Sequence, residues 1–161
     1  MKSHSARQHH GSSSHPYIMF AVNMVLSLIV MYLVMFSMID GWKDFRNNLN
    51  TVYMALTMVA PMGILMLATM GEMYPERRLN FALYAVLVLI FVGAFAGTRT
   101  QALIGDRQFI ESMIPHHSGA ILMCREAALA DSELIDLCRN ISGGQRKEID
   151  QMEAIRSRLG R

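Results

Sequence analysis

Residues 17–39 read YIMFAVNMVLSLIVMYLVMFSMI, an unbroken run without a charged side chain. Two further uncharged runs follow, at 49–70 and at 79–97. The hydrocarbon core of a bilayer is about 30 Å thick, and about 20 apolar helical residues cross it. Each run is close to that length. The three runs therefore predict a membrane domain at 17–97 with three transmembrane helices, which makes the lipid bilayer the first expected partner.

The composition and the N-terminus fit this interpretation. The chain is 52% hydrophobic and 17% charged, whereas soluble domains carry about 25% charged residues. The first run is too long for the core of a signal peptide, and no small-residue cleavage site follows it, so it predicts an anchor. Residues 1–16 are rich in serine and histidine, which predicts a disordered tail.

The charges limit the possible partners and leave the orientation open. The part from residue 98 to 161 carries 9 Lys/Arg and 9 Asp/Glu, so it has no net basic face of the kind that nucleic-acid binding requires. Basic residues near the spans divide evenly between the two sides, so the positive-inside rule does not choose an orientation. An odd number of spans places the two termini on opposite sides.

Beyond residue 98 the sequence becomes amphipathic and predicts a C-terminal helical hairpin at 105–161. The first helix is expected from 105 to about 130, with Asp131 or Ser132 as the N-cap of the second. Its apolar face is Phe109, Met113, Ile114, Ala120, Ile121 and Cys124. The facing seam of the second helix is Leu134, Cys138, Ile141, Gln145, Glu148, Met152 and Ile155. The predicted class is all-α, with three transmembrane helices followed by an antiparallel hairpin that is half of a four-helix bundle.

An antiparallel turn at Asp131 places Cys124 opposite Cys138 and His117 opposite Gln145, with Met113 near Glu148. A hairpin of about 55 residues buries little apolar surface by itself. We therefore expect a homodimer or a higher homo-oligomer. Two consecutive glycines at 143–144 are a weak point of the second helix, since each costs about 1 kcal/mol relative to alanine.

The side chains of the seam suit a soft metal ion. His116 and His117 are adjacent and point about 100° apart on an ideal helix, although Pro115 distorts the helix beside them. Imidazole and thioether together suit copper, and thioether favours Cu(I). The alternative is a His117 packed against Gln145 and a His116 at the surface. Cys124 and Cys138 remain open between a disulfide, soft ligands and buried small side chains.

Two strings carry a resemblance to a known family: FIESMIPHHSGAILMCREA at 109–127 and DSELIDLCRNISGGQRKEIDQM at 131–152. They resemble the domain of unknown function 305 family, whose hallmark is a Met-Ile-x-His-His helix followed by a helix with Gln-x-x-Glu-Ile-x-x-Met. Its members are small helical bundles, usually exported or membrane-anchored, and several are linked to copper binding and resistance. The resemblance implies that the motif positions here are Met113, His116, His117, Met123, Gln145, Glu148 and Met152.

Together these observations predict a membrane-anchored protein that sequesters or hands on copper, as Cu(I) or Cu(II). The expected metal ligands are His116, His117, Met113, Met152, Met123, Glu148, Cys124 and Cys138. The resemblance favours a bacterial inner or cell membrane, with the hairpin outside the cytoplasm. No nucleophile or acid–base constellation is visible, so we expect neither an enzyme nor an organic cofactor.

Two other functions compete with copper binding at the hairpin. Methionines recur every four residues along the second run, at Met54, Met58, Met62, Met66 and Met70. This ladder predicts an alternative in which Cu(I) permeates through the membrane domain. The third possibility is a structural or oligomerisation module without metal.

Overall fold

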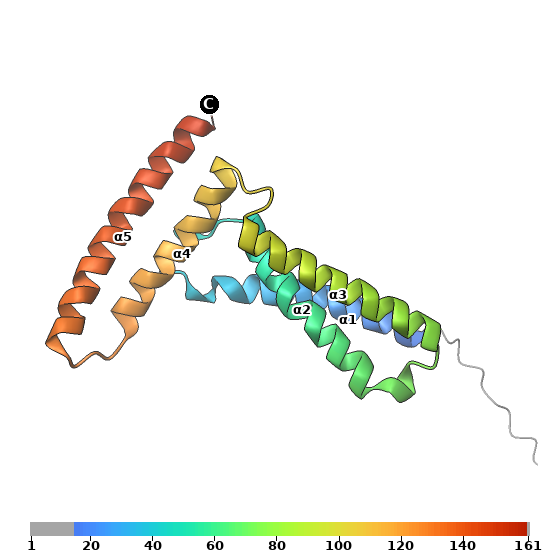
Figure 1. Cartoon of the computed structure of the whole chain (residues 1–161). Coiled ribbons are helices and arrows are strands. Elements are labelled where there is room, and N and C mark those ends of the chain that lie inside the picture. The colour runs from blue at the N-terminus through green and yellow to red at the C-terminus, as the bar shows by residue number, and fades with distance from the viewer. Residues whose placement is uncertain (1–14, 161) are drawn as a thin grey trace, which may run out of the picture.

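The computed structural model describes residues 15–160, which form five α-helices and, within that range, no strand. Figure 1 shows two bodies: α1, α2 and α3 lie side by side, and α4 and α5 form a hairpin that projects from one end of them. The helices are α1 (His15–Val34), α2 (Leu49–Thr69), α3 (Arg77–Thr100), α4 (Asp106–Glu126) and α5 (Ser132–Leu159). Short 3₁₀ turns lie at η1 (Met35–Met38), η2 (Trp42–Asp44) and η3 (Gly71–Met73). The predicted all-α class is confirmed.

Three helices are long and apolar enough to cross a membrane: His15–Met38, Leu49–Thr69 and Arg77–Thr100. Their bounds lie beside the expected runs at 17–39, 49–70 and 79–97, and the third helix continues beyond its uncharged run to include Arg77 and Arg99. The predicted tail at 1–16 falls outside the described residues except for its last two, which begin α1.

The three-helix domain has a thin core and an apolar exterior. Its buried cluster consists of Phe20, Ala60, Leu67, Tyr74 and Leu87. A Cβ atom at Gly63 would lie 2.8 Å from Met24 Sδ and 3.1 Å from a methyl group of Leu87. The glycine therefore lets α1 and α3 approach α2 at one point. Most other large side chains of these helices face outward, which suits a lipid environment and would be unfavourable in water.

In the hairpin, the buried cluster joins Ile110, Ile114 and Ile121 of α4 to Ile149 of α5. Asp131 caps α5, accepting a hydrogen bond from the backbone N–H of Leu134 at 2.9 Å. Two expectations were wrong. Helix α4 ends at Glu126, because residues 127–130 form a non-helical connection, and Phe109 is exposed while Ile110 is buried.

The buried face of α4 differs from the prediction because α4 packs against two partners. Besides α5, it contacts the first loop (residues 35–48), which connects α1 to α2. Ser118 is fully buried there: its hydroxyl accepts a hydrogen bond from the backbone N–H of Asp40 at 2.8 Å and donates one to Asp44 Oδ2 at 2.7 Å. A Cβ atom at Gly119 would lie 3.1 Å from the carbonyl oxygen of Met38. The hairpin therefore docks on the three-helix domain of the same chain through Ser118 and Gly119.

The two kinds of glycine in the hairpin should respond to alanine in opposite ways. We expect Gly119→Ala to lower the stability of the docked hairpin by about 1–3 kcal/mol, because the new methyl group meets backbone that has to move. We expect Gly144→Ala to raise it by up to about 1 kcal/mol, since nothing lies within 4 Å of that position and its φ is not positive. Thermal unfolding of the purified protein, followed by circular dichroism, measures both. Equal shifts for the two variants would contradict the docking contact.

Candidate metal site

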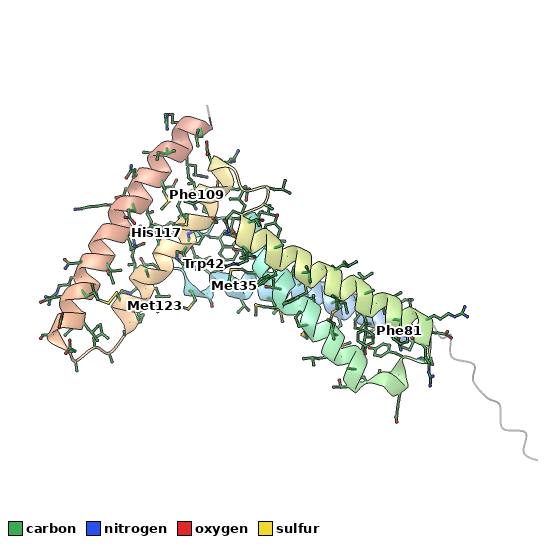
Figure 2. The ribbon with its side chains drawn as sticks, viewed as in Figure 1. Met35, Trp42, Phe81, Phe109, His117 and Met123 are labelled. Carbon is green, nitrogen blue, oxygen red and sulfur yellow. A yellow bond between two sulfur atoms is a disulfide. The ribbon has the colours of Figure 1, made fainter. Side chains whose placement is uncertain are left out.

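His117 and Glu148 form the centre of the candidate site, on facing sides of α4 and α5. His117 Nδ1 lies 3.0 Å from Glu148 Oε2, and their side chains are 14% and 55% exposed. Figure 2 places His117 between the two helices. The nitrogen is buried and has no hydrogen-bond partner among the described residues. The 3.0 Å distance between Nδ1 and Oε2 is short enough for a hydrogen bond. The angle between the two groups, and not the distance, is therefore what prevents one.

The structure corrects the partner expected for His117. It faces Glu148 and not Gln145, although Cys124 does face Cys138 as expected. Helical side chains lean toward the N-terminus of their own helix. In an antiparallel hairpin the two helices lean in opposite directions, so a long side chain such as Glu148 reaches back along α5 to meet His117.

Two methionines lie one helical turn from this pair. Met113 precedes His117 by four residues, and Met152 follows Glu148 by four, so each shares a helix face with its neighbour. Met152 packs against the buried isoleucine cluster. His116 is exposed, and its ring centroid lies 6.2 Å from that of His117. The expected residues Met113, His117, Glu148 and Met152 therefore lie at neighbouring levels of the two facing helices, whereas His116 lies at the surface beside them.

The remaining expected ligands lie elsewhere. Met123 is 60% exposed and six residues beyond His117, which is about 9 Å along the helix. Cys124 and Cys138 form a disulfide with their Cα atoms 5.3 Å apart. In this oxidised form neither sulfur is a thiolate, so the expectation that the two cysteines bind metal does not hold here. Their facing positions put them within bridging distance, and that favours the bond.

The donor set fits a soft, low-coordinate ion better than a hard one. Of the residues that the structure describes, no three His, Cys, Asp or Glu side chains come together, so the four nitrogen, oxygen or thiolate ligands of a structural zinc site are not assembled. What the seam offers is one unpartnered imidazole nitrogen, one adjacent carboxylate and two thioethers a turn away. Thioether donors select Cu(I) over hard cations.

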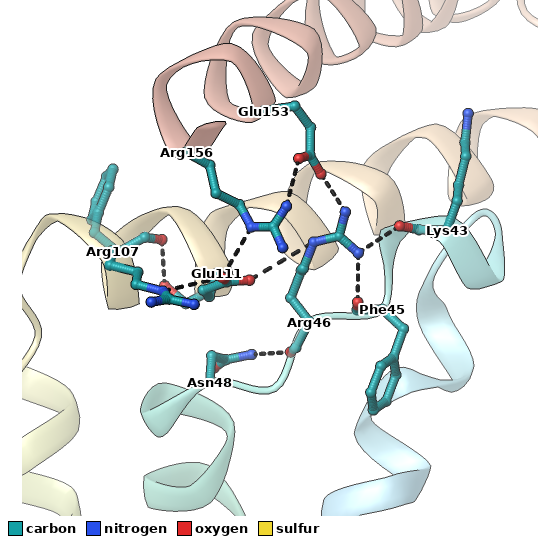
Figure 3. Close-up of polar contacts among 10 residues, drawn as sticks. Lys43, Phe45, Arg46, Asn48, Arg107, Glu111, Glu153 and Arg156 are labelled. Atoms are coloured by element: carbon teal, nitrogen blue, oxygen red, sulfur yellow. Dashed lines mark hydrogen bonds and ion pairs between the residues drawn. The ribbon is translucent and has the colours of Figure 1, made fainter. Parts of the chain in front are cut away.

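A network of ion pairs surrounds the site and ties the hairpin to the first loop. Asp40 pairs with Arg125 and Arg146, and Arg46 pairs with Glu153. Nearer the N-terminus of α4, Arg156 donates to Glu111 at 3.1 Å, as Figure 3 shows. This hydrogen bond raises the pKa of Arg156, so its guanidinium stays charged.

Sequence reasoning missed the network because its partners are 45 to 107 residues apart in the chain. In the sequence, the acidic and basic residues of the first loop were the one signal that could have indicated this network.

The methionine ladder of α2 lies partly on the outside. Met54, Met58 and Met70 are exposed, while Met62 and Met66 are half-buried. The sulfur of Met66 accepts a hydrogen bond from Asn23 of α1 at 3.4 Å. Within one copy, the three exposed methionines therefore point away from the helix contacts.

Comparison with known proteins finds a matching family and a related protein. A family model described as a domain of unknown function (DUF305) matches residues 97–156. An uncharacterized protein of Acanthamoeba polyphaga mimivirus is 33% identical over 114 residues, which is 70% of this chain and 73% of the relative. A stretch of that length in 161 residues has to include most of α2 and α3, so the likeness extends beyond the hairpin. No solved structure matches the chain.

The disulfide should contribute strongly to the stability of the hairpin. It closes a loop with a sequence separation of 14, for which chain entropy corresponds to about 3 kcal/mol. We expect reduction to lower the free energy of unfolding of the hairpin by about that amount, as measured by denaturant titration with and without reductant. A Cys124→Ala/Cys138→Ala variant should give the reduced value under both conditions. A wild-type protein indifferent to reductant would contradict this.

Proposed function

We propose, from the premise that this chain belongs to the DUF305 family, that it is a membrane-anchored protein that binds copper through its C-terminal hairpin. The three apolar helices supply the anchor. The imidazole and thioether groups of the motif residues support the choice of metal. The proposed task is to sequester copper at the membrane surface or to hand it on.

The observation that carries the proposal is the unpartnered Nδ1 atom of His117. A buried polar atom without a partner costs about 1–3 kcal/mol. A cation between Nδ1 and the Glu148 carboxylate would use the nitrogen lone pair and neutralise the carboxylate charge, provided that the ring carries its proton on Nε2. An ion at this position relieves both defects together.

The exposure of the donors suggests how an ion would move. His116 and Glu148 are exposed, whereas His117 and Met152 are largely covered. An ion captured by the outer pair reaches the inner pair by exchanging one ligand at a time. The soft thioethers of Met113 and Met152 would then favour Cu(I) over harder ions.

The disulfide supports the proposed location of the hairpin. Disulfides persist in oxidising compartments and are rare in the cytosol. A bridge between Cys124 and Cys138 therefore favours a hairpin outside the cytoplasm, with the N-terminus inside.

Cu(I) permeation, an association module and a homo-oligomer are proposals that fewer observations support. Permeation of Cu(I) would need several copies, because Met54 and Met58 point away from the helix contacts of one chain. An association module is favoured by the exposed apolar side chains of the hairpin, among them Leu134 and Leu137 on α5. The first loop already covers one face of α4, so a second copy is less necessary than the sequence indicates.

Metal binding by single variants tests the proposed function. We expect purified full-length protein to bind Cu(I), or Ag(I) as a redox-inert ion of the same charge, and His117→Ala to weaken binding about tenfold or more. His15→Ala is the matched control, because it removes one imidazole at the start of α1 and leaves the hairpin intact. Metal analysis and competition titration give the stoichiometry and the affinity.

Three results of this experiment decide the matter. Equal affinities for the His117→Ala variant and the wild type would contradict the site. Met152→Leu, which preserves the volume of a core side chain, should weaken Ag(I) binding and leave any Zn²⁺ binding unchanged. One ion per two chains would indicate a site shared between copies.

Thiol labelling in intact cells tests the orientation. With the hairpin outside, a membrane-impermeant maleimide should label Cys124 and Cys138 only after treatment with an impermeant reductant, because the bridge protects both thiols. Labelling that needs cell lysis and no reductant would place the hairpin in the cytoplasm and contradict the proposed location.

A further inference from the structure

A pocket lies at the base of the hairpin, away from His117. It has a volume of about 500 Å³ and is lined by residues of the first loop, α4 and α5. The lining residues that matter here are Arg46, Asn47, Arg107, Gln108, Glu111 and Arg156. We call this the arginine pocket; Figure 3 shows its three guanidinium groups around Glu111.

The arginine pocket has an excess of positive charge. Its three arginines are paired with two carboxylates, Glu111 and Glu153. One positive charge is therefore left over. Glu111 is buried, and its carboxylate is already paired with the guanidinium groups of the three arginines.

One of the arginines has hydrogen-bonding capacity to spare. The donors of Arg46 are engaged or covered: Nη1 donates to the carbonyls of Lys43 and Phe45, Nη2 donates to Glu153, and Nε is buried 3.7 Å from Glu111 Oε2. Arg107 is 74% exposed, and its ion pair with Glu111 is long at 3.9 Å. A guanidinium offers five donors in a planar fork that matches phosphate oxygens in pairs. The pocket is therefore suited to an anion with several oxygens.

The position of the pocket indicates where that anion comes from. Gln108 accepts a hydrogen bond from the backbone N–H of Leu49, the first residue of α2, at 2.9 Å. The pocket thus lies level with the end of a membrane-spanning helix, where the lipid headgroups would be.

Two exposed apolar side chains at the same end of the three-helix domain support placing the pocket at the level of the lipid headgroups. Trp42 and Leu103 are 87% and 86% exposed, and Figure 2 shows Trp42 beside the junction with α4. Tryptophan is enriched at membrane interfaces. Leu103 has a left-handed φ of 60°, which costs about 1–2 kcal/mol for such a residue, and burial of its side chain in lipid would offset that cost.

We propose that the arginine pocket binds the phosphodiester headgroup of an anionic phospholipid. One phosphodiester carries one negative charge and would neutralise the charge left over in the pocket. Arg107 would donate to the phosphate oxygens, and the partly buried Arg46 would contribute its positive charge, with Asn47 at the rim. The inference rests on the proposed membrane insertion and is independent of metal binding.

Lipid binding by the full-length protein tests the inference. We expect native mass spectrometry from mild detergent to show retained phosphatidylglycerol in preference to phosphatidylcholine, which has the same phosphodiester but no net charge. Arg107→Gln should weaken this binding about fivefold, the loss expected for one basic residue at a lipid surface. Arg139→Gln is the matched control: this arginine is equally exposed at 73% and pairs only with Asp136, near the turn of the hairpin.

Each outcome has a defined meaning. Equal retention of the two lipids, or equal losses for the two variants, would overturn the proposal. Displacement of the lipid by excess inorganic phosphate at the affinity of the lipid itself would make the pocket a site for free anions and would overturn the lipid assignment. If the protein inserts into phosphatidylcholine nanodiscs but retains the two lipids equally, the pocket alone is refuted. If it fails to insert, both the pocket and the membrane anchor are refuted.

Discussion

The hydroxyl of Ser118 accepts a hydrogen bond from the backbone of Asp40 and donates one to the carboxylate of Asp44. Ser118 and Asp44 are both buried, so the bond between them replaces contacts with water that are no longer possible. Beside it, Gly119 brings α4 against the carbonyl of Met38. The relative placement of hairpin and three-helix domain depends on this contact, since Asp40 and Asp44 also hold Arg146. The His117 seam and the arginine pocket both lie on the N-terminal side of it along α4, at residues 113–117 and 107–111.

Much of the fold was predictable because it depends on local patterns. Uncharged runs long enough to cross a bilayer have one common interpretation, and an aspartate before an amphipathic stretch is a helix N-cap, as Asp131 proves to be. The facing of Cys124 and Cys138 followed from an antiparallel turn of known position. These features need only residue spacing and helix geometry.

The docking of the hairpin was not predictable in the same way. Nothing in the local pattern distinguishes a serine that bonds to residues 74 to 78 positions away from one at the surface. The prediction assumed that α4 has one buried face, so it selected Phe109 and missed Ile110. It assigned no role to Arg46, Glu111 and Arg156. Removing one member of such a cluster would leave a partly buried charge uncompensated, which is the costly case for buried ion pairs.

The hydrogen bond between Gln108 and Leu49 has a geometric consequence for any protein that exchanges a ligand with His117. It fixes the foot of α4 at the level where α2 leaves the apolar region. His117 is nine residues farther along, which is at most about 14 Å of helix rise. Under the proposed function, a partner that takes an ion from His117 would have to approach within that height of the bilayer, which would favour a small or flat carrier over a bulky globular one.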